Sequence, residues 1–150
     1  MEFVGTPENI IGKRIVPCDN NSICNYMKRR CPFNQPTVMF RKQAVIDAGN
    51  YQHWFWNEDY YLWIRMMLNN CKMANLPDVL VKMRTGRDQY ARRGGLKYFR
   101  SEEKLQRYML KKKVISLFQY LYNVTGRFVI QVIMPNKLRG LIFRLLFRKH

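Results

Sequence analysis

Two adjacent carboxylates, Glu58 and Asp59, are the residues best suited to acid–base chemistry in this chain. Only ten Asp and Glu occur among 150 residues, against 27 Lys and Arg. The pair opens an apolar-periodic segment in which Leu62, Met66 and Cys71 lie near one face. Acidic side chains are favoured near the positive end of a helix dipole, which gives the pair a structural interpretation. A carboxylate at the mouth of a fold can instead act as a general base.

Short motifs surround the carboxylates in a fixed order across about half of the chain. They are Asn34-Gln35-Pro36-Thr37-Val38-Met39-Phe40-Arg41-Lys42, Ala48-Gly49-Asn50-Tyr51, Glu58-Asp59-Tyr60 with Leu62-Trp63, and Asn75-Leu76-Pro77 with Leu80-Val81 and Arg84. This order resembles the acceptor half of family-two glycosyltransferases, which are bacterial enzymes of the GT-A fold that build surface polysaccharides. The resemblance implies an α/β fold: the C-terminal half of a GT-A domain followed by a mostly helical extension.

The resemblance also implies a reaction. Such enzymes transfer a sugar, with inversion, from a nucleotide-sugar donor to a saccharide or lipid-linked acceptor. The Asp of the Glu-Asp pair is the usual catalytic base in the family, so that role falls on Asp59. Glu58 either orients Asp59, contacts the acceptor or caps the helix. Many relatives carry an acidic residue at the position of Tyr61, so the acceptor preference of those relatives does not predict the acceptor of this chain.

An aromatic-rich run precedes the carboxylates and supplies candidate acceptor-binding residues. Flat aromatic faces can stack on sugar rings, so His53, Trp54 and Trp56 are assigned to substrate binding. Use of the same side chains in the core or against a membrane is an equal alternative.

A basic loop, Gly86–Gly95, is the candidate diphosphate-binding element. Guanidinium groups match phosphate oxygens bidentately, and Arg87, Arg92 and Arg93 lie in this loop. By analogy with related transferases, the loop would close over the nucleotide diphosphate. The family signature Gln-x-x-Arg-Trp is absent here, so an ordinary exposed loop remains an alternative.

The nucleotide-binding half of the family's domain has no counterpart in this sequence. In the family, that Rossmann-like half carries an Asp-x-Asp motif whose carboxylates hold Mg²⁺ or Mn²⁺ against the diphosphate. The nearest sequence, Asp19-Asn20-Asn21, lacks the second carboxylate. We therefore expect a fragment that holds no metal or other cofactor of its own, with no transferase activity when isolated.

Charge is concentrated in the second half of the chain. Residues 1–81 carry nine basic and seven acidic side chains, whereas residues 82–150 carry 18 basic and three acidic ones. Nucleic acid, an anionic membrane surface or nucleotide-sugar phosphates would all suit such a region, and a solvated basic face is the plain alternative. A basic binding module for nucleic acid or membrane, without catalysis, is thus the second hypothesis, although no nucleic-acid-binding signature occurs.

The cysteine pattern indicates neither zinc nor a secreted protein. No two cysteines have zinc-knuckle spacing, and the two histidines are too scattered to complete a site. The chain does not start with a cleavable signal sequence, so we expect reduced thiols in a cytoplasmic protein. The residues concerned are Cys18, Cys24, Cys31, Cys71, His53 and His150.

The elements that must position these residues follow from periodicity and turn chemistry. We expect an α/β part over residues 1–85 and a basic, helical extension over residues 86–150. Residues 1–35 are expected to be mainly loop, with one strand or short helix. The predicted strands are 37–40 and 79–83, and the predicted helices are 42–48 ended by Gly49, 59–70, 96–134 with a break at Thr125-Gly126, and 135–147.

The last predicted helix has an apolar stripe beside basic residues, which is typical of a membrane-surface element. Arg139 and Arg144 interrupt it, so it cannot span a bilayer. We expect peripheral association with the inner face of the cytoplasmic membrane; packing on the protein itself is the alternative. The stripe is Leu138, Leu141, Ile142, Leu145 and Leu146, with Lys137, Arg144 and Arg148 on another face.

Overall fold

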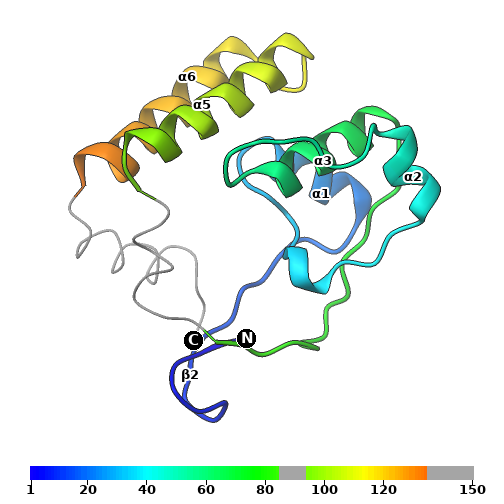
Figure 1. The fold of residues 1–150 in the computed structure, drawn as a ribbon, viewed down its shortest axis with the longest axis vertical. Helices are drawn as coiled ribbons and strands as arrows, with labels where there is room; N and C mark the ends of the chain where they lie inside the picture. Colours follow the sequence, from blue (N-terminus) through cyan, green and yellow to red (C-terminus); the bar gives the residue numbers. More distant parts are fainter. Residues whose placement is uncertain (85–93, 135–150) are drawn as a thin grey trace.

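The protein is a mixed α/β structure in which helices dominate, as the sequence predicts. The computed structural model describes residues 1–84 and 94–134. Three helices form a body beside a small sheet, and a two-helix hairpin packs against that body (Figure 1). The helices are α1 (Asn20–Met27), α2 (Lys42–Asp47), α3 (Glu58–Leu68), α5 (Leu96–Lys111) and α6 (Leu117–Phe128), with a 3₁₀ turn at Gln35–Thr37 and a π-helical turn at Val129–Ile133.

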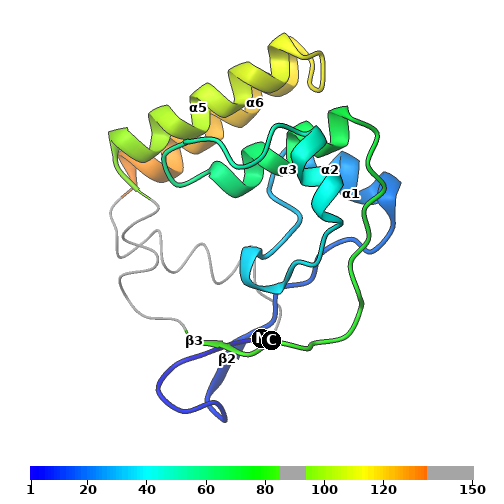
Figure 2. The ribbon, with the colours of Figure 1, turned by 45° about the vertical axis from the view of Figure 1, so that its right-hand side comes forward.

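The sheet is short and lies at the end of the molecule opposite the α5–α6 hairpin (Figure 2). Its strand order is β2-β1-β3, with β1 (Glu2–Phe3) antiparallel to β2 (Ile10–Gly12) and parallel to β3 (Met83–Arg84). The predicted strand 79–83 is therefore wrong except at its last residue. Residues 79–82 belong to no strand, and Leu80 is exposed.

The second predicted strand, 37–40, is also wrong. The segment begins as the end of the 3₁₀ turn and continues without regular structure, and Met39 is 98 % exposed. The 1–35 segment contains more order than predicted, namely two strands and helix α1. Asp19 is the N-cap of α1, where its Oδ1 accepts a hydrogen bond of 2.9 Å from the Ser22 amide. That bond lowers the pKa of Asp19 and accounts for an acidic residue at this position.

The predictions for the two central helices are confirmed. α2 ends just before Gly49, whose φ of +83° suits glycine, and α3 ends at the Asn69-Asn70 stop. Arg65 of α3 reaches back to this corner and donates to the carbonyl oxygens of Ala48 (2.5 Å) and Asn50 (2.6 Å). Since Arg65 is buried, these bonds fix α2 against α3 and set the direction of the following loop.

The hairpin turns earlier than the sequence suggested. The predicted break at Thr125-Gly126 is wrong, because Gly126 lies inside α6. The chain reverses between Lys112 and Ser116 instead, with Lys113 at a φ of +57°. Ser116 and Gln119 then form a capping box, each side chain bonding the other's backbone amide, which starts α6.

One hydrophobic cluster joins the body to the hairpin. Its fully buried members come from α1, α3 and α5, so the N-terminal segment and the helical segment share a core. The predicted division at residue 85 stays a prediction. The fully buried hydrophobic side chains are Ile23, Met27, Leu62, Ile64, Leu105 and Met109.

Candidate active site

The candidate site lies at the start of α3, where the sequence placed it. Glu58 and Asp59 occupy the first helical turn, with Asn57 as the N-cap residue. Exposure falls along the turn: Glu58 is exposed, Asp59 is half-buried and Tyr60 is buried. Asp59 Oδ1 accepts a hydrogen bond of 2.6 Å from the Tyr60 amide. Both carboxylates therefore lie at the positive end of the helix dipole, which is a favourable position for acidic side chains.

A pocket of about 540 Å³ opens beside this turn. The aromatic-rich loop lines most of it, and Glu58 completes the wall, whereas Asp59 is not among the lining residues. His53 is exposed and Trp56 is 53 % exposed, so both are accessible from this side. The lining residues are Tyr51, Gln52, His53, Trp54, Phe55, Trp56 and Glu58.

The two tryptophans of the loop lie in different surroundings. Trp54 packs against Tyr61 with ring centroids 4.3 Å apart, and Lys104 Nζ lies 4.5 Å from its ring centroid. Its indole N–H donates to the Ser101 carbonyl at 3.2 Å. Trp56 makes an edge contact with Phe55 at 6.1 Å and has a φ of +57°, which is uncommon for a large side chain. Trp54 is thus fixed by α5, whereas Trp56 is turned outward on a strained backbone.

Ser101 of α5 holds the loop in place, a role that the sequence analysis missed. Its hydroxyl donates to the Phe55 carbonyl at 2.5 Å and accepts from Asn57 Nδ2 at 3.3 Å. Both contacts join positions more than 40 residues apart, so no local motif could reveal them. The loop that carries the pocket is consequently docked on the helical hairpin.

A half-buried cysteine, Cys31, and an arginine, Arg14, lie in a neighbouring part of the structure. Burial raises the pKa of Cys31 to about 12, and the negative charge of Asp59 adds to that rise, which places Asp59 within electrostatic reach of Cys31. Arg14 binds the same loop by donating to the Cys31 carbonyl at 2.5 Å and to Asn34 Oδ1. Arg14 was not predicted either, because no nearby motif marks it.

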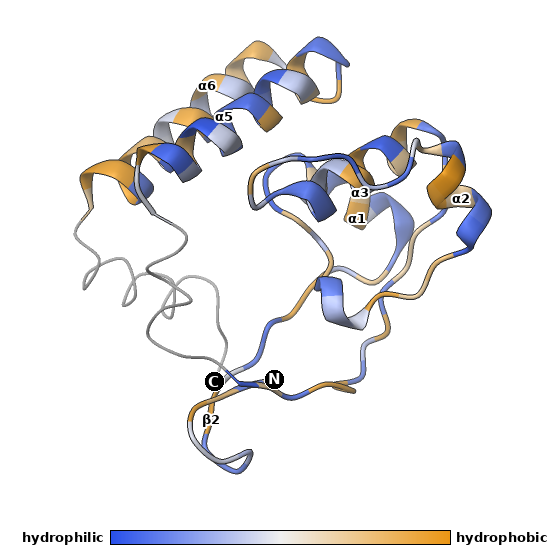
Figure 3. Cartoon of the chain, in the orientation of Figure 1, coloured by the Kyte–Doolittle hydropathy of each residue, from blue (hydrophilic) through white to orange (hydrophobic). Residues whose placement is uncertain are grey.

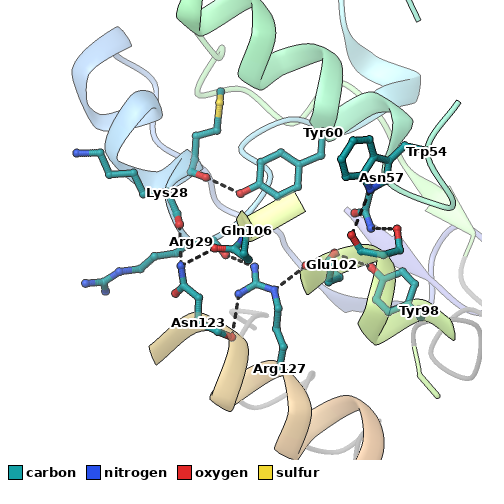
Figure 4. A network of polar contacts seen from close by, with 12 residues as sticks. Lys28, Arg29, Trp54, Asn57, Tyr60, Tyr98, Glu102, Gln106, Asn123 and Arg127 are labelled. Carbon is teal, nitrogen blue, oxygen red and sulfur yellow. Dashed lines mark hydrogen bonds and ion pairs between the residues drawn. The ribbon is translucent and has the colours of Figure 1, made fainter. Parts of the chain in front are cut away.

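A buried polar seam connects the hairpin to the rest of the protein (Figure 4). The Arg127 guanidinium lies 2.6 Å from a carboxylate oxygen of Glu102 and donates to the Arg29 carbonyl at 2.5 Å. Burial opposes the charge on Arg127 and is the largest single influence, but the Glu102 carboxylate, together with Tyr60 and Tyr98, raises the pKa of Arg127 overall. The Tyr98 hydroxyl donates to Glu102 at 3.2 Å. This ion pair therefore ties both helices of the hairpin to the end of α1.

Neutral groups extend the seam beside the ion pair. Asn123 Nδ2 donates to the Lys28 carbonyl and to Gln106 Oε1, both at 2.9 Å. From α3, the Tyr60 hydroxyl donates to the Met27 carbonyl at 2.5 Å. The C-terminal end of α1 is thus held by α3 and α6 together. Tyr60, which makes the contact from α3, is the residue next to the candidate base Asp59.

Neither a metal cluster nor a membrane span occurs among residues 1–84 and 94–134. No group of three or more His, Cys, Asp and Glu side chains there could hold a metal ion, so the described residues do not fit the divalent cation of the family. Likewise, no helix in these two ranges has the length and apolarity to cross a bilayer. The four cysteines are free thiols. Arg87, Arg92, Arg93 and the predicted helix 135–147 lie outside the described residues.

The fold and site define an α/β protein with a carboxylate-edged aromatic pocket, and comparisons with known proteins give its class. The chain is 36% identical over 148 residues to an Escherichia coli UDP-Gal:alpha-D-GlcNAc-diphosphoundecaprenol beta-1,3-galactosyltransferase, covering 99% of this chain and 52% of that enzyme. It is 46% identical over 98 residues to the Erwinia amylovora amylovoran biosynthesis glycosyltransferase AmsE, covering 65% of this chain and 37% of AmsE. An uncharacterized glycosyltransferase of Haemophilus influenzae is 34% identical over 148 residues, which are 99% of this chain and 54% of the relative.

These similarities make the chain a homologue of bacterial glycosyltransferases. It spans about half the length of the curated relatives it matches. No protein-family profile matches the chain. No solved structure is significantly similar to it.

Proposed function

We propose that this chain is the acceptor-side half of an inverting GT-A glycosyltransferase of family two that acts in surface polysaccharide biosynthesis. The observation that carries the proposal is the position of Glu58 and Asp59 at the start of buried helix α3, beside an aromatic pocket, in a chain homologous to such transferases. The name of the Erwinia amylovora relative refers to amylovoran biosynthesis, which supports the polysaccharide role. The donor is a nucleotide sugar bound by a separate N-terminal half.

In the proposed reaction, Asp59 is the base. The acceptor hydroxyl oxygen attacks the anomeric carbon of the donor sugar while the bond from that carbon to the diphosphate oxygen breaks. The hydroxyl proton passes to the Asp59 carboxylate, and the nucleoside diphosphate leaves with the bonding electrons. The resemblance assigns the proton to Asp59, which follows the pocket-lining Glu58 in the same helical turn, and Glu58 contacts the acceptor at the pocket edge. Arg87, Arg92 and Arg93 are proposed to neutralise the leaving diphosphate.

The acceptor is proposed to be a saccharide or a lipid-linked sugar lying in the aromatic pocket. His53 offers a polar edge, Trp56 offers an exposed ring for stacking, and Trp54 supports the loop from behind. The name of the E. coli relative specifies a diphosphoundecaprenol-linked acceptor, which supports a lipid-linked substrate here. Such an acceptor would place the protein peripherally at the inner face of the cytoplasmic membrane.

A chimera tests the proposal. Residues 1–150 would replace the aligned 148-residue portion of the E. coli galactosyltransferase, and galactose transfer from its UDP-Gal donor would be measured. Product formation by the chimera, with none from the isolated 150-residue chain, supports an acceptor-side half. A folded chimera that binds UDP-Gal but forms no product contradicts it.

The second candidate function is a nucleic-acid-binding module without catalysis. The basic charge of the second half favours it, because phosphate contacts dominate such binding. It explains neither the pocket nor the homology. A gel shift with random oligonucleotides at physiological salt separates the two, because tight binding is expected only for the second.

A further inference from the structure

Helix α6 presents a large apolar face to solvent. Phe118 is 78 % exposed and Tyr122 is 66 % exposed, and Val129 and Ile133 continue the same exposed stripe after α6. The spacing of four, seven and four residues keeps these side chains on one side of a helix. Figure 3 shows the apolar colouring of α6 beside a predominantly hydrophilic α5. The exposed large apolar residues of this segment are Leu117, Phe118, Leu121, Tyr122, Phe128, Val129 and Ile133.

The opposite face of the same segment is polar and buried, which inverts the usual arrangement of a soluble helix. Asn123 and Gln131 are 6 % and 7 % exposed, and Arg127 lies in the seam with Glu102. Helices of water-soluble proteins bury their apolar stripe and expose the polar one. Polar-inward, apolar-outward helices suit a surface that meets an apolar medium. The polar side chains of this helix therefore face the protein, and its apolar side chains face outward.

Basic side chains accompany the apolar face. α5 exposes a row of cations at helical spacing that ends with Lys111, and Lys112 and Lys113 follow in the α5–α6 turn. Both acidic residues of α5 are already engaged, Glu102 with Arg127 and Glu103 with Arg107. The hairpin thus combines exposed cations with exposed aromatic and aliphatic groups. The cations are Lys97, Arg100, Lys104, Arg107, Lys111, Lys112 and Lys113.

We propose that the α6 face from Leu117 to Ile133 docks on an anionic phospholipid bilayer. The apolar side chains enter the boundary between headgroups and acyl chains, and Lys111, Lys112 and Lys113 at the end of α5 and in the following turn contact lipid phosphates. Tyr122 suits this depth because its ring is apolar and its hydroxyl is polar. The inference does not rest on the proposed transferase activity, since none of these residues lines the pocket.

The charge and chemistry favour lipid over two other occupants. Nucleic acid would use the cations but would leave Leu117, Leu121 and Ile133 without partners. A second copy of the chain would bring another strongly basic hairpin against this one, which electrostatic repulsion opposes. An anionic bilayer satisfies both the cations and the apolar groups.

Vesicle co-sedimentation of the whole 150-residue chain tests the proposal. Vesicles of phosphatidylcholine, with and without about 30% phosphatidylglycerol, are compared at about 0.1 M salt. We expect the Phe118→Ser/Tyr122→Ser variant to bind about tenfold more weakly to both. We expect the Lys111→Gln/Lys112→Gln/Lys113→Gln variant to lose about a hundredfold on anionic vesicles alone. Circular dichroism and unfolding midpoints verify that each variant is folded.

Matched controls lie on the body, away from the hairpin. Leu76→Ser/Leu80→Ser removes two equally exposed apolar side chains, and Lys42→Gln/Lys72→Gln/Lys82→Gln removes three exposed lysines. Unchanged vesicle binding by both controls is expected. The proposal is overturned by any of four results: full binding by the Phe118/Tyr122 variant, binding lost instead with Leu141→Ser/Leu145→Ser, a dimer or oligonucleotide complex that the α6 variant abolishes, or loss of vesicle binding when the chain is joined to the N-terminal half in the galactosyltransferase chimera.

Discussion

Two pairs of adjacent carboxylates occur in this chain, and their surroundings differ sharply. Glu102 and Glu103 lie within α5, where Arg127 and Tyr98 bond the first and Arg107 and Tyr120 bond the second. Glu58 and Asp59 lie at the start of α3, where Glu58 is exposed at the edge of a pocket.

The contrast shows how structural and functional carboxylates can be told apart in one chain. The α5 pair receives side-chain donors from both helices of the hairpin, so its charge serves to hold α6 in place. The α3 pair lies in the first turn of its helix, and the adjoining pocket leaves space for a ligand. The role of two neighbouring carboxylates can therefore be assigned only from the groups that surround them in the structure.

Removing the buried arginine of the seam gives the largest expected stability effect. Arg127→Ala leaves Glu102 as an uncompensated charge of low exposure, so we expect the free energy of unfolding to fall by about 3 kcal/mol. Urea denaturation followed by circular dichroism measures this. Arg107→Ala is the matched control, because the Arg107–Glu103 pair is exposed, with the arginine side chain 60% accessible. An equal loss in the two variants would contradict a structural role specific to the buried pair.

The two tryptophans sharpen the comparison at the pocket. Trp54→Ala removes packing against Tyr61 and a hydrogen bond to Ser101, so we expect a loss of about 3 kcal/mol. Trp56→Ala removes an outward ring that is 53 % exposed and leaves the positive φ as it is, so we expect a change within about 0.5 kcal/mol. Denaturant titrations of both variants measure the difference. Equal destabilisation would show that Trp56 is a packing residue and remove its basis as a sugar platform.

Alkaline pH tests the environment next to Asp59. The pKa of Cys31 is about 12 in the folded chain and 9.0 ordinarily, so between these values the folded thiol stays protonated while the unfolded thiol ionises. The free energy of unfolding should therefore be independent of Cys31 well below pH 9 and fall as pH rises toward 12, by up to about 1.4 kcal/mol per pH unit. Cys31→Ala should flatten this slope by that amount. Tyr60 is present in both proteins and contributes equally to their pH dependence. Equal slopes of the free energy of unfolding against pH in the two proteins would therefore contradict a raised pKa for Cys31.

Local patterns predicted the elements that carry the site but not the contacts that fix it. α2, α3 and the glycine between them followed from apolar periodicity and end signals. The two predicted strands failed because β-forming residues need a partner strand, and β1 pairs only with Met83–Arg84 on that side. Ser116 and Gln119 form a capping box that starts α6, whereas Gly126 lies inside this helix and does not end it, because an isolated glycine weakens a helix without breaking it. Ser101 and Arg14 act across long sequence separations, which no pattern encodes.

The most direct test of the central claim is sugar transfer by the galactosyltransferase chimera carrying Asp59→Asn. We expect this change to lower kcat by about 10³-fold, because the acceptor hydroxyl loses its base, while the unfolding curve shifts by less than about 0.5 kcal/mol. Asp47→Asn, a remote exposed carboxylate on α2, should retain full activity. Transfer by the Asp59→Asn chimera within tenfold of the unchanged chimera would contradict Asp59 as the base.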